Sequence, residues 1–114
     1  MKIDNLLKGS GGHFYRYRRR HPQECLTGMK GVFAFLSLED FSDWSVLYVQ
    51  ASNDLGEVEG SRIEQSLAYR EACLLGRPTV AIYVTGSARG PYRTTVADSI
   101  VEANDPPLNR KLAA

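Results

Sequence analysis

Three short apolar runs, residues 31–36, 44–49 and 79–84, constrain the fold of this chain more than any other feature. Each is rich in β-branched and aromatic residues and is shorter than a typical helix, so we expect three β-strands. The polar segment 39–43 separates the first two runs by only a few residues. This spacing favours an antiparallel hairpin for the first two strands.

Two helices are expected to cover this sheet. Ser61 and Glu64 have the spacing of a capping box, and Leu67 begins a series of apolar residues at helical intervals, so the first helix is predicted to begin at Ser61. A second helix is predicted over about 95–103, ended by the prolines at 106–107. The resulting β-β-α-β-α order predicts a small α/β sandwich, in which a three-stranded, mostly antiparallel sheet is flanked by helices.

The chain of 114 residues is long enough for one domain, and its positive charge is concentrated at its beginning. Residues 1–30 carry seven Lys or Arg against two acids, whereas the rest of the chain carries seven against eleven. We therefore predict a basic N-terminal arm or leader (1–27) ahead of a folded domain (28–114). No apolar run approaches the ~20 residues that span a bilayer, and no signal-peptide core is present, which favours a cytoplasmic protein without membrane contact.

The arm contains a segment in which arginines alternate with aromatic rings. Arginines neutralise phosphates while aromatic rings stack on bases, so this composition is typical of nucleic-acid binding. The predicted nucleic-acid contacts are Arg16, Tyr17, Arg18, Arg19, Arg20 and His21. In the structural alternative, the aromatic rings pack on the domain and the arginines stay in solvent. A cationic strand of this kind could also bind an acidic protein partner.

Three segments fall at the landmarks of a known family. Gly31-Val32-Phe33 opens the first predicted strand, Tyr48-Val49-Gln50 ends the second, and the Asn- and Pro-rich segment 104–110 follows the last helix. In these segments the chain resembles the GIY-YIG nuclease superfamily, at its Gly-Ile-Tyr, Tyr-Ile-Gly and closing Asn-Pro-Pro-x-Asn patterns. The resemblance covers about residues 28–110. It implies a GIY-YIG-like fold and metal-dependent cleavage of phosphodiester bonds.

The resemblance also implies which residues would carry out that chemistry. A tyrosine assists the attacking water, an arginine stabilises the transition state, and a glutamate holds Mg²⁺. Tyr48 matches the second-signature tyrosine, Arg62 is the available arginine, and Phe33 replaces the first-signature tyrosine. Ala97 stands at the position of the metal-binding glutamate, and a methyl group cannot ligate Mg²⁺. Asp98 is the alternative ligand, although it lies about 100° around the helix.

We therefore expect a GIY-YIG nuclease-like domain that binds nucleic acid, with impaired or lost cleavage, of the kind found among phage or mobile-element accessory proteins. One alternative is an active, Mg²⁺-dependent endonuclease, in which Ala97 is a deliberate replacement or Asp98 has taken over its role. In the absence of activity no cofactor is expected. The other alternative is a protein-interaction or inhibitor module that uses the basic arm. Steep salt dependence of nucleic-acid binding is expected for the first two hypotheses and not for the third.

Overall fold

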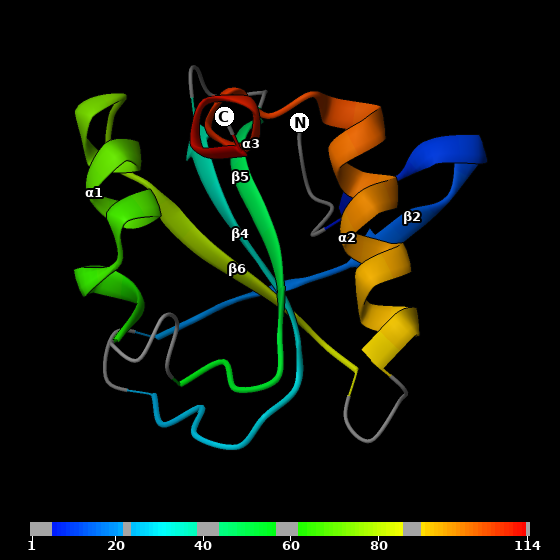
Figure 1. Ribbon diagram of the computed structural model, residues 1–114, viewed down its shortest axis with the longest axis horizontal. Coiled ribbons are helices and arrows are strands. Elements are labelled where there is room, and N and C mark those ends of the chain that lie inside the picture. Colours follow the sequence, from blue (N-terminus) through cyan, green and yellow to red (C-terminus); the bar gives the residue numbers. More distant parts are fainter. Residues whose placement is uncertain (1–5, 22–23, 39–43, 57–61, 86–89, 114) are drawn as a thin grey trace.

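The computed structural model describes residues 6–21, 24–38, 44–56, 62–85 and 90–113 (Figure 1). Its strands are β1 (Leu6–Lys8), β2 (Phe14–Arg16), β3 (Arg18–Arg19), β4 (Gly31–Leu38), β5 (Trp44–Ser52) and β6 (Thr79–Val84). Two short 3₁₀ helices, η1 (Ser10–Gly12) and η2 (Ile63–Gln65), accompany three α-helices, which are α1 (Leu67–Leu74), α2 (Gly90–Asn104) and α3 (Pro107–Ala113).

An antiparallel sheet with the strand order β3-β6-β4-β5 forms the centre of the molecule. The long strand β4 pairs with β5 on one side and with β6 on the other. The predicted α/β class and the predicted hairpin are therefore confirmed. The described sheet has four strands rather than three, because β3, from the basic segment, pairs with β6 and forms an edge. A second, two-stranded antiparallel sheet joins β1 and β2.

A β-bulge in β5 determines which side chains face which side of the sheet. Phe35 lies opposite Tyr48, whereas Leu36 lies opposite Val46, so Leu47 is an extra residue in β5. As a result, Leu47 and Tyr48 both pack on one side of the sheet, and Val46 packs on the other.

The sheet separates two hydrophobic cores. Helices α1 and α3 cover one side, and α2 with the β1–β2 pair covers the other (Figure 1). The core on the α1 side contains the aromatic rings of Phe33 and Phe35, whereas the core on the α2 side is aliphatic, with Val32, Val96 and Ile100. Because both faces of β4 are buried, this strand has a continuous apolar sequence rather than an alternating one.

Helix α1 begins later than predicted. Its first residue is Leu67 and its N-cap is Ser66, whose Oγ accepts a hydrogen bond from a backbone N–H of the first turn at 3.2 Å. The prediction that this helix begins at Ser61 is therefore wrong, and Ser61 itself lies outside the described residues. Glu64 lies in η2, and its carboxylate pairs with Arg20 instead of closing a capping box.

The two C-terminal helices differ in their place: α2 covers a face of the sheet, and α3 reaches its β5 edge. Helix α2 begins more than a turn earlier than predicted and ends before Pro106, as predicted. Helix α3 was not predicted, and Pro107 occupies its first position, where no backbone N–H is needed. The side-chain amide of Asn109 accepts a hydrogen bond from Val49 N–H and donates one to Val49 C=O, both at 2.9 Å, which occupies the outer edge of β5. Among the described helices, none is long and apolar enough to cross a membrane.

The described part of the first 27 residues packs against the rest of the chain. Leu7 of β1 and Tyr17, between β2 and β3, are 5% and 2% exposed and belong to the α2-side core. The backbone N–H of Ser10 donates to Oγ of Ser99 in α2 at 2.9 Å. Residues 6–20 therefore contribute to the core and the sheets as well as to the charge.

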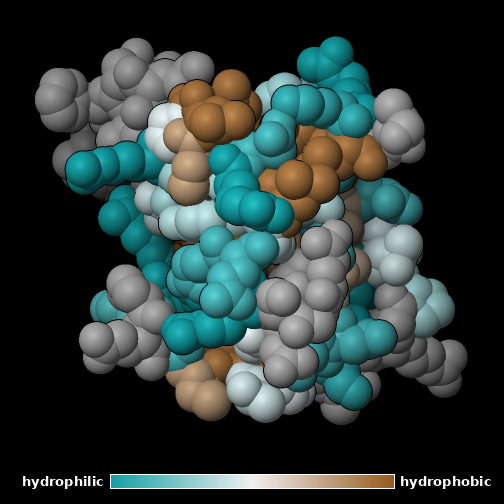
Figure 2. Space-filling view, turned by 60° about the vertical axis from the view of Figure 1, so that its left-hand side comes forward, coloured by the Kyte–Doolittle hydropathy of each residue, from teal (hydrophilic) through white to brown (hydrophobic). Residues whose placement is uncertain are grey.

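Helix α1 presents an apolar outer side to solvent. Figure 2 looks toward the side of the molecule that carries α1, and most of the hydrophobic surface in this view lies in its upper half. Leu67, Leu74 and the following Leu75 are 49%, 77% and 52% exposed. Exposed leucines are common in soluble domains, so this region alone does not indicate a function.

Candidate nucleic-acid interface

The positions that the family resemblance singles out are divided between the two sides of the sheet. Phe33 and Tyr48 lie on the α1 side, where the centroid of the Tyr48 ring is 6.2 Å from that of Phe33 and 5.8 Å from that of Phe35. Phe33 is fully buried and Tyr48 partly so. The Tyr48 hydroxyl donates a hydrogen bond to Oε1 of Gln50 at 2.7 Å, so the residue in place of the signature glycine positions this tyrosine.

Ala97 and Asp98 belong to the α2 side and do not meet Phe33 and Tyr48. Ala97 is 7% exposed within the apolar core, so a carboxylate at this position would be buried among hydrocarbon side chains. Asp98 is exposed and lines a cavity with His13 and Glu102. These residues do not fit a magnesium site at the position where the resemblance implies a glutamate, because Ala97 supplies no oxygen. Within the described ranges, no group of three or more His, Cys, Asp or Glu could hold a metal ion.

The basic segment forms one edge of the main sheet. Strand β3 pairs with β6, and the N–H of Arg20 extends this ladder by donating to a β6 carbonyl at 2.9 Å. Arg18 and Arg19 are exposed along this edge, on the α1 side and the α2 side of the sheet respectively, and the exposed Arg16 belongs to the preceding strand β2. Tyr17 is buried in the α2-side core, so its ring is not available to stack on a base.

Two further exposed residues flank the arginines of this segment in the sequence. Phe14, at the start of β2, is 59% exposed, and His21 follows Arg20. The backbone N–H of His21 donates to Oε1 of Glu24 at 3.2 Å. Of the rings in this segment that could stack on a base, Phe14 is exposed and Tyr17 is buried.

Two arginines of this edge are paired with acids. Arg18 Nη1 donates to Glu24 Oε1 at 2.9 Å, and a second hydrogen bond joins the same groups. Hydrogen bonding from Arg18, assisted by the His21 N–H, lowers the pKa of Glu24 to about 2. Arg20 pairs with Glu64, and its side chain is 10% exposed. The positive charge of the segment is therefore partly neutralised within the molecule.

The Arg20–Glu64 pair is largely buried but incompletely hydrogen-bonded. Nε of Arg20 and Oε1 of Glu64 are buried and have no hydrogen-bond partner among the described residues. Burial raises the pKa of Glu64, but the hydrogen bond from Arg20 and the charges of Arg20 and Arg62 outweigh this effect, so the pKa is lowered overall. Glu64 is therefore ionised at neutral pH, and the guanidinium of Arg20 retains unused hydrogen-bonding capacity.

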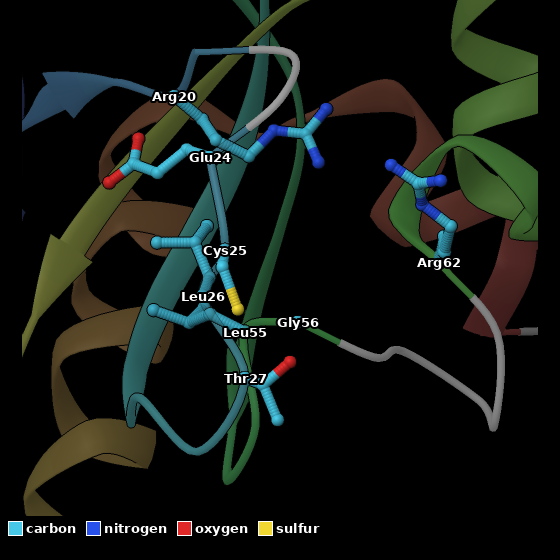
Figure 3. Close-up of a pocket in the computed structure, with 8 residues that line it drawn as sticks. All are labelled: Arg20, Glu24, Cys25, Leu26, Thr27, Leu55, Gly56 and Arg62. Atoms are coloured by element: carbon cyan, nitrogen blue, oxygen red, sulfur yellow. The ribbon is translucent and has the colours of Figure 1, made fainter.

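A cavity of about 330 Å³ opens at the Arg20 end of the basic edge (Figure 3). Arg20, Cys25, Thr27 and Arg62 are among the residues that line it. In Figure 3 the guanidinium groups of Arg20 and Arg62 face each other across the opening, whereas the carboxylate of Glu24 points away from both. Arg62 is exposed and forms no ion pair within the described part of the chain. The cavity therefore brings together two cationic side chains that are far apart in the sequence.

Two loops that form the wall of this cavity are fixed to each other. Oδ1 of Asp54 accepts hydrogen bonds from the N–H groups of Gly28 and Gly56, at 3.0 and 2.8 Å. A Cβ atom on Gly56 would lie 2.7 Å from the backbone nitrogen of Thr27, so a larger residue there would push the loops apart. The wall is therefore positioned by backbone contacts and not only by flexible side chains.

Cys25 is an exposed cysteine at the mouth of this cavity. Hydrogen bonds from the backbone N–H of Thr27 and then from its side chain lower the pKa of the Cys25 thiol. The thiolate is the nucleophilic form of cysteine, so Cys25 should react with alkylating reagents faster than an unperturbed thiol at neutral pH. Cys73, near the end of α1, is also exposed.

Sequence reasoning did not identify Glu24, Glu64, Cys25 or Thr27 as part of this region. The two acids are 6 and 44 residues away from the arginines that they bind, and no local pattern indicates pairing over the longer distance. The lowered pKa of Cys25 depends on local loop geometry, which composition does not reveal. No protein-family model, curated protein or solved structure matches this chain.

Proposed function

We propose that this chain is a nucleic-acid-binding domain whose contact surface is the basic edge of its main sheet, and that it does not cleave nucleic acid efficiently. The observation that carries this proposal is the set of exposed arginines in and beside the edge strand β3: Arg18 on its α1 side, Arg19 on its α2 side and Arg16 in the preceding strand β2. The cavity between Arg20 and Arg62 lies where this strand ends.

The dimensions and chemistry of this edge suit an extended polyanion. Residues 14–20 are close to extended, and at ~3.3 Å per residue they span roughly 20 Å, which is enough for several consecutive phosphates. Arginine binds phosphate through paired N–H groups, and the exposed ring of Phe14 could stack on a base. A short edge strand also needs protection from pairing with other strands, and charged residues supply it. A binding measurement distinguishes contact with phosphates from protection of the edge strand.

The second part of the proposal, weak or absent cleavage, is supported by where the residues at the catalytic positions of the resemblance lie. Ala97 lies in the α2-side core, and Phe33 and Tyr48 lie in the α1-side core. An endonuclease needs a nucleophile activator, a cation and a stabilised leaving group at one phosphate. The described residues at these positions do not converge on one place. The basic edge can hold a nucleic acid without supplying these groups.

Fluorescence anisotropy with labelled single-stranded and duplex DNA and RNA, measured over a salt series, tests the binding. The informative variant is the double substitution Arg16→Ala and Arg19→Ala, and the matched control is Arg70→Ala with Arg110→Ala, which removes two exposed charges elsewhere. We expect the edge variant to lower the salt slope by about 1.5 to 2, and the control to change it much less. Parallel incubation of a plasmid with Mg²⁺ or Mn²⁺ should leave it intact.

Equal losses in the edge and control variants would overturn the proposed interface. Absence of any salt-dependent binding would overturn nucleic-acid binding altogether and favour an acidic protein partner for the arginines. Rapid metal-dependent nicking would overturn the second part of the proposal.

A further inference from the structure

The cavity beside Arg20 offers a more specific binding site than the open edge of the sheet. The arginines of the edge are exposed, whereas the Arg20 side chain is nine-tenths buried and is held in place by Glu64. Arg62 approaches from the segment before η2, on the other side of the opening (Figure 3). Two guanidinium groups that face each other across a cavity of about 330 Å³ are suited to a compact anion.

We propose that this cavity binds a single phosphate group, and that in a nucleic acid this group is the phosphate at the end of a strand. The second statement rests on the proposed function, because the cavity lies where the basic edge ends. A strand that passes Arg18 on the α1 side of the sheet reaches Arg20 next, whereas the side chain of Arg19 lies on the α2 side. The terminal phosphate of the nucleic-acid strand then lies between the two guanidinium groups.

Charge favours a terminal phosphate over an internal one. A phosphate monoester carries about −1.5 to −2 charges near pH 7, whereas an internal phosphodiester carries one. Around the cavity, Arg20 and Arg62 contribute two positive charges and Glu64 one negative charge. Glu24 also lines the cavity, but its carboxylate is hydrogen-bonded to Arg18 and points away from Arg20 and Arg62 in Figure 3. Arg62 forms no ion pair within the described residues, and the second charge of a monoester strengthens its attraction.

The volume of the cavity also favours a single phosphate group. Small-molecule sites have volumes from about 300 Å³ upward, so this cavity is at the lower end of that range. It can take a phosphate with its attached sugar, but not a run of nucleotides.

The two cysteines allow a direct test of phosphate binding that does not depend on nucleic acid. Cys25 lines the cavity and Cys73 lies outside it, and both are exposed. Alkylation by iodoacetamide, followed by mass spectrometry of both cysteine-containing peptides, reports the two sites in one sample. We expect inorganic phosphate to slow alkylation of Cys25 several-fold relative to Cys73, whereas chloride at equal ionic strength has no such effect.

Arg62→Gln is the informative variant, because Arg62 is exposed and its loss leaves the Arg20–Glu64 pair in place. Arg70→Gln removes an exposed charge from α1 and is the matched control. We expect Arg62→Gln to abolish the protection of Cys25 and Arg70→Gln to preserve it. Equal alkylation of Cys25 with and without phosphate in the unaltered protein would overturn the phosphate site.

The strand-end assignment is tested with oligonucleotides of one sequence that carry a 5′-phosphate, a 3′-phosphate or hydroxyl groups at both ends. One phosphorylated form is expected to bind about tenfold more tightly than the hydroxyl form, and Arg62→Gln should remove this difference while the salt-dependent binding to the edge remains. Equal affinities of all three forms would overturn the strand-end assignment and leave the proposed function standing. Protection of Cys25 by phosphate in a protein that binds no oligonucleotide would instead overturn the proposed function.

Discussion

Tyr17 carries a hydroxyl group that is buried and has no hydrogen-bond partner among the described residues. Burial raises the pKa of this hydroxyl, and the charge of Arg19 offsets only part of that effect. The change Tyr17→Phe removes the unsatisfied oxygen and keeps the ring in the core. We expect the free energy of unfolding in urea to rise by up to about 1 kcal/mol, with unchanged affinity for nucleic acid.

Tyr17→Ala is the control, because it removes the ring as well and should cost about 3–5 kcal/mol. A loss of more than about 1 kcal/mol for Tyr17→Phe would mean that the hydroxyl has a partner. A loss of nucleic-acid affinity for the same variant would give Tyr17 the stacking role that its burial argues against.

Asn109 stabilises the outer edge of β5 through two hydrogen bonds to Val49. Asn109→Ala leaves the N–H and C=O of Val49 without these partners, so we expect a loss of about 1–3 kcal/mol in the free energy of unfolding. Asn109→Asp separates the two bonds, because a carboxylate accepts from the N–H but cannot donate to the C=O. Its cost should be at least as large as that of the alanine variant, and full stability of the aspartate variant would show that only the N–H bond matters.

At the scale of elements, the start of β4 lies too close to the end of β6 to leave room for a side chain. A Cβ atom on Gly31 would lie 2.2 Å from the carbonyl oxygen of Tyr83. Gly31→Ala must therefore separate these strands, and we expect it to lower the free energy of unfolding by about 1–3 kcal/mol. Thermal and urea unfolding measure this loss, and a change below about 0.5 kcal/mol would mean that the strands adjust freely. The requirement for glycine here is structural and needs no catalytic explanation.

The strands could be predicted from the sequence because their apolar runs are short and uninterrupted, and burial on both faces requires that pattern. The start of α1 could not be predicted from the sequence, because Ser61 and Ser66 can both act as N-caps and only tertiary contacts determine which of them does. Glu64 would suit a capping box, yet it pairs with Arg20, 44 residues away. Helix α3 was missed because Pro107 was interpreted as a terminator, although proline is also favoured at the first position of a helix.

At the scale of the whole molecule, the sequence predicted a basic segment but not its neutralisation by Glu24 and Glu64. The sequence gives the number of charged residues in a segment, but which charges lie close together depends on the fold. The same limit applies to the positions suggested by the family resemblance. The sequence places Phe33, Tyr48 and Ala97 on neighbouring elements, but the sheet separates Ala97 from the two aromatic residues.

The pairing of Arg18 with Glu24 should affect the behaviour of the protein in acid. The folded-state pKa of Glu24 is about 2, below the ordinary value for a glutamate, mainly because of the hydrogen bond from Arg18. A group with a depressed folded-state pKa stabilises the fold above its unfolded pKa, and this contribution is lost as the pH falls from about 4.5 toward 2. The contribution is small because Arg18 is half exposed.

Carboxyl-carbon NMR titration measures this value directly, and we expect the Glu24 midpoint near 2 in the unaltered protein. In an Arg18→Ala variant the midpoint should return toward the ordinary glutamate range of about 4.3. A normal midpoint in the unaltered protein would show that the Arg18–Glu24 pair does not persist in solution.

The pairing of edge arginines with acids also predicts a binding behaviour that a simple cationic tail would not show. If the arginines of the edge contact phosphates, Glu24 competes with the nucleic acid for Arg18. Glu24→Gln should therefore strengthen binding, by roughly threefold to tenfold at low salt, and should make the salt slope steeper by up to about 1. Glu102→Gln makes the same change in net charge on the outer side of α2 and should have a much smaller effect. Anisotropy titrations of both variants measure these changes, and circular dichroism confirms that both variants fold. Equal gains in affinity for the two variants would mean that only net charge affects binding and that Arg18 makes no specific contact.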